Sequence, residues 1–287
     1  MSHERDAGHG SVAGLCAVAG FSRQAYYQEQ RRRSRRTVEE DAIVELVQAQ
    51  RRVHPRIGVR KLGVLIAADL AEMGIEIGRD RFFDLLRGRG LLNKRRLRWT
   101  KTTDSRHGFF VWPNLIRNVV ATMPHQVWVC DLTYIRTEEG FLYLSLVTDA
   151  YSRKIVGYWL HDTLEYAGCL GALKMALAQL PEGARPIHHS DRGMQYCCVE
   201  YISLLQEYKC PISMTEFNHC YENAMAERVN GILKGEYGLD LTFQDKAQAR
   251  AAVGQAIGIY NDLRPHTRLG YRTPSSVHAQ LEQKRAA

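Results

Sequence analysis

Three acidic residues stand in short sequence contexts that suit carboxylates holding divalent metal over a phosphate. Asp131 lies in CDLTYIRT, Asp191 in HHSDRGMQY and Glu227 in CYENAMAERVNGILKGE, with 59 residues in the first gap and 35 in the second. Carboxylate oxygens are the hard ligands that Mg²⁺ prefers. Two such ions about 3.5–4 Å apart promote in-line displacement at phosphorus. The trio therefore predicts a DNA-processing enzyme with two Mg²⁺ ions, for which Mn²⁺ can substitute.

The glutamate lies in a segment whose polar residues share one predicted helical stripe. Asn223, Glu227, Gly231 and Lys234 follow one another at i, i+4, i+8 and i+11, a spacing that places side chains on one face. Gly231 would leave room for DNA, and Lys234 would offer a cation to a neighbouring phosphate. We predict that Asn223 and Lys234 contact DNA. A surface helix with ordinary charged residues is the alternative.

The elements needed to position the acids are also visible as changes of residue pattern. Branched and aromatic residues predict three strands in an antiparallel meander, and a later short strand ends immediately before Asp191. Ligand groups favour that end of a strand in open α/β sheets. The order of strands and helices predicts an α/β fold with a ribonuclease-H-like mixed sheet, of the integrase catalytic core type. The predicted elements are strands 127–137, 141–152, 153–161 and 186–190, with a helix over 164–180.

The net charge of +8 is unevenly distributed along the 287 residues. Residues 1–118 contain 23 Lys and Arg against 13 Asp and Glu, whereas the remainder contains 16 against 18. A basic first part joined to a nearly neutral remainder is typical of a polyanion-binding arm on a working domain. A solvated charged surface is the simpler alternative.

The N-terminal segment has the pattern of helix, glycine turn and second helix that is typical of a helix-turn-helix motif. A helix is predicted before Gly20, and Ser22 is a suitable N-cap for a second, short helix. Arg23 and Gln24 would start that helix, where such motifs place base-contacting side chains, and the basic run 31–36 would follow on phosphates. Any two-helix hairpin with a glycine turn is the alternative. The apolar positions expected to share one face of the first helix are Val12, Leu15 and Val18.

A second helical unit is predicted between this motif and the strands. Helices are expected at about 38–52, 59–72 and 79–87, and the basic and polar stretch after them indicates a linker. The residues predicted to contact DNA here are Arg60, Lys61, Arg95 and Arg96. The expected divisions are 1–36 helix-turn-helix-like, 37–100 helical DNA-binding unit, 101–120 linker, 121–240 integrase catalytic core and 241–287 C-terminal helix and tail.

Four blocks of sequence resemble the DDE transposases of bacterial insertion sequences, specifically the insertion sequence three family of the retroviral integrase superfamily. They are VWVCDLTYIRT, HSDRGMQY, CYENAMAERVNGILKGE and YNDLRPHTRLGYRTPSSVH. Lys234 also stands seven positions after Glu227, as in that family. By position, the family's catalytic triad falls on Asp131, Asp191 and Glu227, which implies metal-dependent strand cleavage. TEFNHC before YENA and HPRIGVRKL around Arg60 depart from the family's pattern.

The resemblance carries further expectations about substrate and partners. It implies cleavage at terminal inverted repeats, release of a 3′-OH that attacks another phosphodiester, and synapsis by a homo-oligomer. It also implies that the chain resembles the downstream product of a frameshift pair, with a possible upstream-frame partner protein. The C-terminal block is predicted to pack on the core because Pro265 and Gly270 punctuate it. Arg264 within it is a further predicted DNA contact.

Two other functions stay open on the sequence alone. One is a non-catalytic DNA-binding repressor or inhibitor of the full-length transposase, and the other is a ribonuclease-H-like nuclease without strand transfer. No apolar run has the length of a membrane span and no secretory signal is visible, and the seven cysteines show no paired framework. We therefore expect a cytoplasmic, nucleoid-associated protein with no membrane partner.

Overall fold

The computed structural model describes residues 12–93, 110–216 and 223–279. The chain divides into two compact units, Met1–Ala49 with Ile66–Leu92 and Gln50–Leu65 with Asn93–Ala287. Within the described ranges, no helix has both the length and the apolar character that crossing a bilayer requires.

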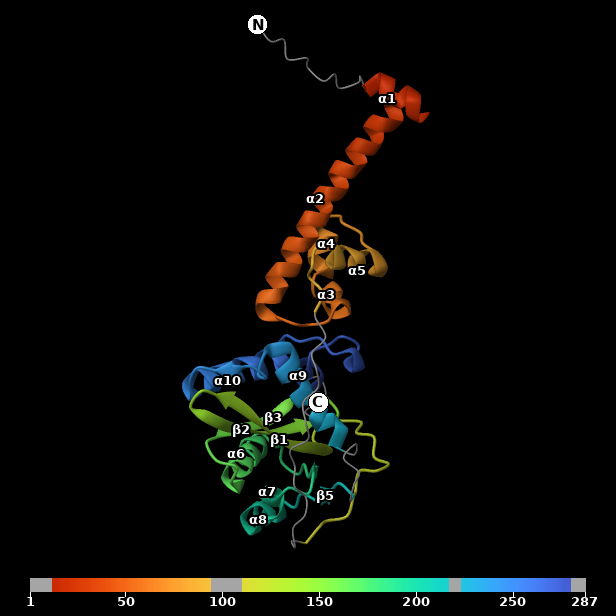
Figure 1. Ribbon diagram of the computed structural model, residues 1–287. Helices are drawn as coiled ribbons and strands as arrows, with labels where there is room; N and C mark the ends of the chain where they lie inside the picture. The colour runs from red at the N-terminus through yellow and green to blue at the C-terminus, as the bar shows by residue number, and fades with distance from the viewer. Residues whose placement is uncertain (1–11, 94–109, 217–222, 280–287) are drawn as a thin grey trace. The chain divides into compact units, whose positions relative to one another are not determined.

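The N-terminal unit begins with two helices joined by the predicted turn. Helix α1 is Val12–Ala19 and α2 is Arg23–Val53 (Figure 1). Gly20 has a positive φ of 74°, a backbone conformation that glycine adopts without steric cost. The Ser22 hydroxyl oxygen accepts a hydrogen bond from the backbone N–H of Ala25 at 3.0 Å, which confirms the predicted N-cap.

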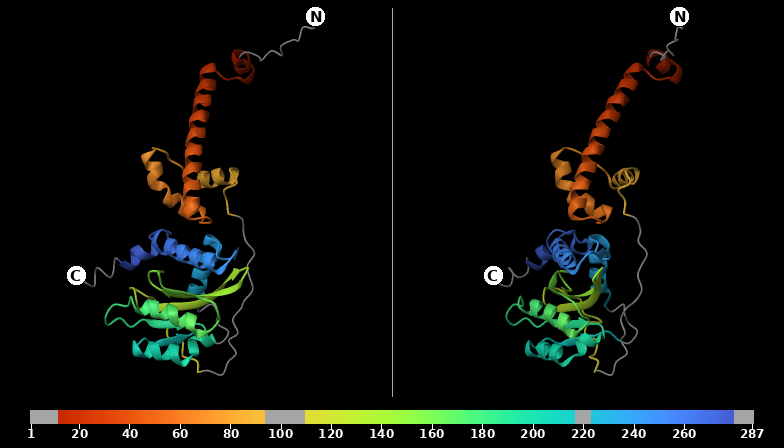
Figure 2. Two further views of the ribbon diagram at one scale, coloured as in Figure 1. Left: turned by 90° about the vertical axis from the view of Figure 1, so that its left-hand side faces the viewer. Right: turned by 60° about the vertical axis from the view of Figure 1, so that its left-hand side comes forward.

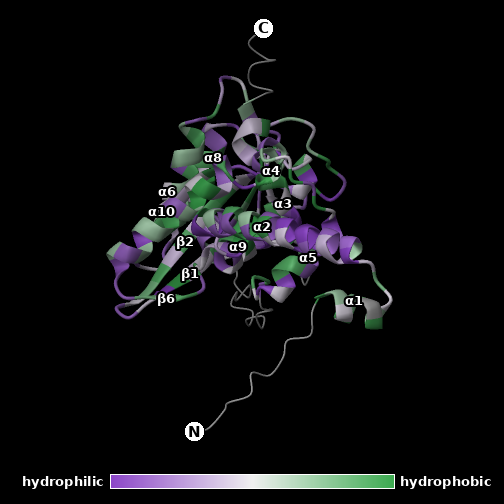
Figure 3. Cartoon of the chain, turned by 90° about the horizontal axis from the view of Figure 1, so that it is seen from above, coloured by the Kyte–Doolittle hydropathy of each residue, from purple (hydrophilic) through white to green (hydrophobic). Residues whose placement is uncertain are grey.

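The second helix is not short, contrary to the sequence prediction. It continues for 31 residues through the basic run and through the predicted boundary between residues 36 and 37. Its first half is largely hydrophilic (Figure 3), and a helix without an apolar face gains support from ion pairs one turn apart. The three pairs are Arg33–Glu29 at 3.0 Å, Arg35–Glu39 at 2.9 Å and Arg36–Glu40 at 2.9 Å.

The predicted apolar face of α1 does not face a core within the described residues. Val18 is 91% exposed and Leu15 is 63% exposed, while Cys16 is buried. The predicted helix over 59–72 is likewise two helices, α3 (Val59–Leu65) and α4 (Ala67–Glu72), because the backbone leaves helical geometry at Ile66. The prediction of a helix from Arg79 is confirmed by α5, Arg79–Gly88.

The second unit is built on a mixed sheet in the order β3-β2-β1-β4-β5, with β6 paired to β1. Strands β1, β2 and β3 pair antiparallel, and β4 and β5 continue the sheet in parallel with β1. The predicted meander and mixed α/β sheet are therefore confirmed. The strands are β1 Val127–Thr137, β2 Gly140–Asp149, β3 Ile155–His161, β4 Ile187–Ser190, β5 Ile212–Met214 and β6 Thr242–Phe243.

Helices cover both faces of this sheet (Figures 1 and 2). On one face, α6 (Tyr166–Leu177), α7 (Met194–Cys197) and α8 (Val199–Glu207) pack on a core that includes Trp128 and Cys130. Helix α6 approaches β3 closely at Gly157, where an added Cβ would lie 2.2 Å from the Ala172 carbonyl oxygen. On the other face, α9 (Ala224–Tyr237) and α10 (Lys246–Asp262) pack on Ile135.

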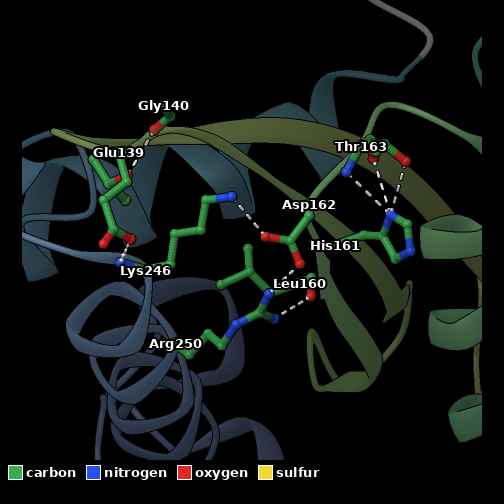
Figure 4. Close-up of polar contacts among 9 residues, drawn as sticks. Glu139, Gly140, Leu160, His161, Asp162, Thr163, Lys246 and Arg250 are labelled. Atoms are coloured by element: carbon green, nitrogen blue, oxygen red, sulfur yellow. Dashed lines mark hydrogen bonds and ion pairs between the residues drawn. The ribbon is translucent and has the colours of Figure 1, made fainter.

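Polar contacts attach α10 to the ends of two strands (Figure 4). The Arg250 guanidinium donates to the Leu160 carbonyl at 2.7 Å and to the Asp162 carboxylate at 2.6 Å. Lys246 pairs with the same carboxylate at 2.9 Å, and its backbone N–H donates to Glu139 at 3.0 Å. These contacts fix the start of α10 beside the β1–β2 hairpin.

Candidate active site

Strand pairing places two of the predicted acids at the same end of neighbouring strands. Strand β4 pairs with β1 only from Val127 to Val129 and ends at Ser190, immediately before Asp191. Asp131 therefore stands just beyond the paired part of β1. Because parallel strands end at a common edge, Asp131 and Asp191 lie near the point where β1 and β4 separate.

The Asp131 carboxylate is held by two hydrogen bonds. Asn230 of α9 donates its side-chain N–H to Asp131 Oδ2 at 2.8 Å, and the backbone N–H of Leu132 donates to Oδ1 at 3.0 Å. Burial and then the negative charge of Asp191 raise the pKa of Asp131 to about 7, and Glu227 contributes in the same direction. The negative charges of the other two predicted acids therefore both act on the Asp131 carboxylate.

Asp191 and Glu227 are positioned by the elements that follow β4 and begin α9. The backbone N–H of Gly193 donates to Asp191 Oδ1 at 3.0 Å. Glu227 lies in the first turn of α9 with an exposed side chain. Just before that turn, the Asn223 side-chain amide donates to the Cys130 carbonyl at 3.0 Å. This bond ties the start of α9 to β1 next to Asp131.

The donor chemistry of the three acids fits divalent metal, although their side chains are not assembled around one point. Among the described residues, no three His, Cys, Asp or Glu side chains form a group that could hold an ion. All three acids nevertheless supply hard oxygen ligands. Burial and then the negative charge of Asp191 disfavour the ionised form of the Asp131 carboxylate, and a bound cation would favour that form.

The remaining residues of the predicted helical stripe have different surroundings. Asn223 is only 3% exposed, so its side chain faces β1. The Lys234 ammonium lies 4.8 Å from the Tyr134 ring centroid, and burial lowers its pKa although Asp131 opposes the shift. A Cβ added at Gly231 would meet nothing within 4 Å, which agrees with the open space expected there.

A buried polar layer beneath the acids was missed by sequence reasoning. His188 Nε2 lies 3.0 Å from the Cys130 sulfur and 2.8 Å from the Tyr201 hydroxyl oxygen. Burial lowers the pKa of His188 to about 3, so the ring is neutral. The doubled histidine before Ser190 was the available signal, because buried polar side chains in a central strand require partners.

Two predicted DNA contacts, Arg264 and Lys61, lie inside the second unit. Arg264 is 1% exposed and donates two hydrogen bonds to the Glu236 carboxylate, at 2.7 and 2.8 Å. The Lys61 ammonium lies 3.4 Å from the same carboxylate. Burial would raise the pKa of Glu236, but the hydrogen bonds and charge of Arg264, followed by Lys61, lower it. The C-terminal block is thus attached to the core through the ion pair between Arg264 and Glu236, as its predicted packing on the core requires.

The other predicted DNA contacts fall at the surface or outside the described residues. Arg60 is exposed on α3, and Arg23 and Gln24 are exposed at the start of α2. Arg95 and Arg96 lie outside the residues that the structure describes. Contact of any of these side chains with DNA stays a prediction.

Comparison with known proteins identifies the family of the chain. Two models, each described as an integrase core domain, match residues 121–220 and 208–274. The chain is 36% identical over 276 residues to the insertion element IS600 uncharacterized 31 kDa protein of Shigella sonnei, covering 95% of this chain and 100% of that protein. Two insertion-sequence transposases, of IS629 and IS3A, also match over at least 90% of both chains. The chain belongs to the IS3-type insertion-sequence transposases, which are integrase-superfamily proteins.

Other relatives match over similar lengths. The transposase for insertion sequence element IS629 of Shigella sonnei is 32% identical, with 93% of this chain and 90% of that protein covered. The transposase InsF for insertion sequence IS3A of Escherichia coli (strain K12) is 30% identical, with 96% of each covered. The catalytic core domain of HTLV-2 integrase, solved in complex with magnesium, aligns at a TM-score of 0.45 with 18% identity, covering 55% of this chain and 99% of that one.

Proposed function

We propose that this transposase cleaves DNA at the terminal inverted repeats of its insertion element and joins the released 3′-OH to a second phosphodiester. The observation that carries the proposal is the convergence of Asp131, Asp191 and Glu227 from β1, the end of β4 and α9. Asp131 and Asp191 stand where β1 and β4 separate, and Asn223 ties the start of α9, which carries Glu227, to β1 beside Asp131. Membership of the family supports DNA transposition as the overall process.

The roles of the chain's own residues follow from their positions. Asp131, Asp191 and Glu227 would hold two Mg²⁺ ions, with Mn²⁺ as a substitute. When bound, such ions would activate the attacking oxygen and stabilise the leaving oxygen in displacement at phosphorus. Asn230 orients the Asp131 carboxylate, and Asn223 fixes the first turn of α9 that carries Glu227. Asp131 thus has a partner from another element, of the kind that orients metal ligands.

We also propose that the basic N-terminal part binds the element ends. DNA would be contacted by the helix-turn-helix-like segment, 1–36, and by the helical unit, 37–100. A linker, 101–120, would connect them to the catalytic core, 121–240. The C-terminal helix and tail, 241–287, would follow the core. The uneven charge of the sequence supports this division. Synapsis of two ends would involve a homo-oligomer, and an upstream-frame protein would assist end recognition.

The catalytic proposal is tested with purified protein, labelled duplex containing the element's terminal repeat, and Mg²⁺. Asp131→Asn, Asp191→Asn and Glu227→Gln should each lower nicking and joining at least about 100-fold, because each removes a charged ligand while preserving side-chain size. Glu207→Gln, on the far end of α8, is the matched control and should retain activity. Unchanged turnover in Asp191→Asn would reject its assigned role.

Binding of the same duplex without added metal separates catalysis from recognition. Triad variants should bind it as well as the unmodified protein. Sequencing of the products distinguishes strand transfer from hydrolysis alone, because only transfer yields joined ends. A protein that binds ends and never nicks them with either metal would instead be a non-catalytic regulator.

A further inference from the structure

We propose that a groove beside Asp191 binds an unpaired nucleobase next to the scissile phosphodiester, which deepens the proposed function and rests on it. The groove is lined from the β1–β2 hairpin by Tyr134, Arg136 and Phe141, from α6 by Tyr166, and by Asp191 at the end of β4. All of these residues belong to the second unit.

Strand register explains why aromatic rings gather there. Tyr134 pairs with Tyr143 and Arg136 pairs with Phe141 across the antiparallel hairpin. Directly paired residues, and residues two apart on one strand, project from the same face of a sheet. One face of the hairpin therefore carries three rings and a guanidinium in a compact cluster.

Helix α6 covers only part of this face. It approaches β3 at Gly168, where an added Cβ would lie 3.0 Å from the His161 Cβ, and it begins at Tyr166. Beyond the start of α6, some ring side chains around the groove remain partly open to solvent. Phe141 is consequently 49% exposed and Tyr166 is 38% exposed. Exposed rings clustered beside a reactive centre are typical of a binding surface.

The rings are held in place without being buried. The Tyr134 and Phe141 rings meet edge to face, with centroids 5.5 Å apart and an interplanar angle of 76°. The Lys234 ammonium contacts the Tyr134 ring at 4.8 Å from its centroid. A cation over a ring and an edge-to-face neighbour both restrain ring orientation. The groove therefore presents preorganised stacking surfaces.

The charges around the groove favour a base over a bare phosphate. The exposed Glu165 lines the groove with a carboxylate, which repels phosphate but accepts hydrogen bonds from the exocyclic amino groups of bases. Arg136 supplies a positive charge on the hairpin, where the backbone of the same strand could pass. Stacking of unpaired bases on aromatic side chains is a general mode of single-strand binding.

The test measures binding in EDTA, so that its result does not depend on cleavage or on the triad. Two probes are compared: an element-end duplex with a short single-stranded tail, and the same molecule with abasic sites in the tail. The unmodified protein should bind the first probe more tightly. Stacking of one base contributes about 1–3 kcal/mol, which corresponds to a preference of about 5-fold to 150-fold.

Phe141→Ala combined with Tyr166→Ala should remove this preference and leave affinity for the abasic probe unchanged. Phe141→Tyr, which retains a ring, should preserve the preference. Tyr208→Ala is the matched control, because Tyr208 is a similarly exposed tyrosine, 42%, outside the groove. Retained preference in the double alanine variant, or no preference in the unmodified protein, would overturn the proposal. A shift from oligomer to monomer with unchanged preference would assign the groove to protein association instead.

Discussion

Asn230 is the side chain whose single contact most directly supports the proposed chemistry. Its amide donates to Asp131 at 2.8 Å from about one turn beyond Glu227 on α9, so it ties Asp131 to the helix that carries Glu227. Asn230→Ala should lower the cleavage rate by about 10-fold to 100-fold, the usual effect of removing a partner that orients a metal ligand. Nicking of terminal-repeat DNA at saturating Mg²⁺ measures this effect.

The control for Asn230→Ala is Asn118→Ala, at an exposed asparagine of the segment before β1. It should leave the rate unchanged. Binding of the duplex in EDTA should be equal for both variants, because Asn230 acts through Asp131. Full activity in Asn230→Ala would show that the carboxylate is positioned without this amide.

Residue types and spacing predict that the three acids act together, but these patterns do not indicate which other residues hold the acids in place. The triad contexts were visible because each acid follows or occupies a patterned segment of the sequence. Asn230 and His188 were not visible, since their partners are 99 and 58 residues away. Arg264 was read as a DNA contact because charge is evident in a sequence, whereas its pairing with Glu236 is not.

At the scale of elements, the Arg264–Glu236 pair attaches the C-terminal block to the end of α9. Arg264→Ala should lower the free energy of unfolding by about 3–5 kcal/mol, because it leaves the largely buried Glu236 carboxylate without its two-bonded partner. Urea titration followed by circular dichroism measures the change. Arg264→Lys should recover only part of the loss, since an ammonium cannot reproduce the paired donors.

A surface ion pair provides the comparison for that prediction. Arg117 lies 3.0 Å from Glu216 with side chains 57% and 42% exposed, and exposed pairs contribute about 0–1 kcal/mol. Arg117→Ala should therefore have little effect. Similar losses in the Arg117 and Arg264 variants would show that burial of the second pair does not matter.

The strands of the core and helix α5 were predicted closely, whereas the length of α2 was not. Alternating and apolar patterns mark β1 to β3 because each strand contacts a core. Helix α2 has no such pattern over its first half, and its length depends on ion pairs such as Arg36–Glu40. The aromatic groove also escaped notice, because the pairing of Arg136 with Phe141 depends on hairpin register.

At the scale of the whole molecule, buried neutral histidines should make folding sensitive to acid. Burial lowers the pKa of both His188 and His266 to about 3, against about 6.5 in an unfolded chain. Between these values the unfolded state binds more protons at these two histidines, so their contribution to stability is complete above about pH 6.5 and declines as the pH falls. At pH 5 each histidine should contribute a loss of about 2 kcal/mol.

Urea titrations at about pH 7.5 and pH 5 test this acid sensitivity. His188→Gln should lower the unfolding free energy at the higher pH, because Cys130 and Tyr201 lose the ring nitrogen with which they interact. It should also reduce the difference in unfolding free energy between the two pH values. Asp131, whose pKa is raised to about 7, changes stability in the opposite direction over this range, so the decisive comparison is between proteins. A pH dependence of the unfolding free energy that His188→Gln leaves unchanged would contradict neutral burial of the His188 ring.

The uneven charge of the whole chain should appear in the salt dependence of DNA binding. Arg31 and Arg32 are exposed on α2 and have no ion pair within the described residues, whereas Arg35 and Arg36 pair with Glu39 and Glu40. Each phosphate contact contributes about 0.9 to the slope of log affinity against log salt. Arg31→Gln with Arg32→Gln should therefore lower the slope by nearly 2. Arg35→Gln with Arg36→Gln removes the partner of Glu39 and one of two partners of Glu40, which also pairs with Arg81. This variant should weaken binding at low salt through local charge and change the slope less. Equal slopes in the unmodified protein and the first variant would mean that these two arginines do not contact phosphates. They would then belong to a solvated charged surface of α2.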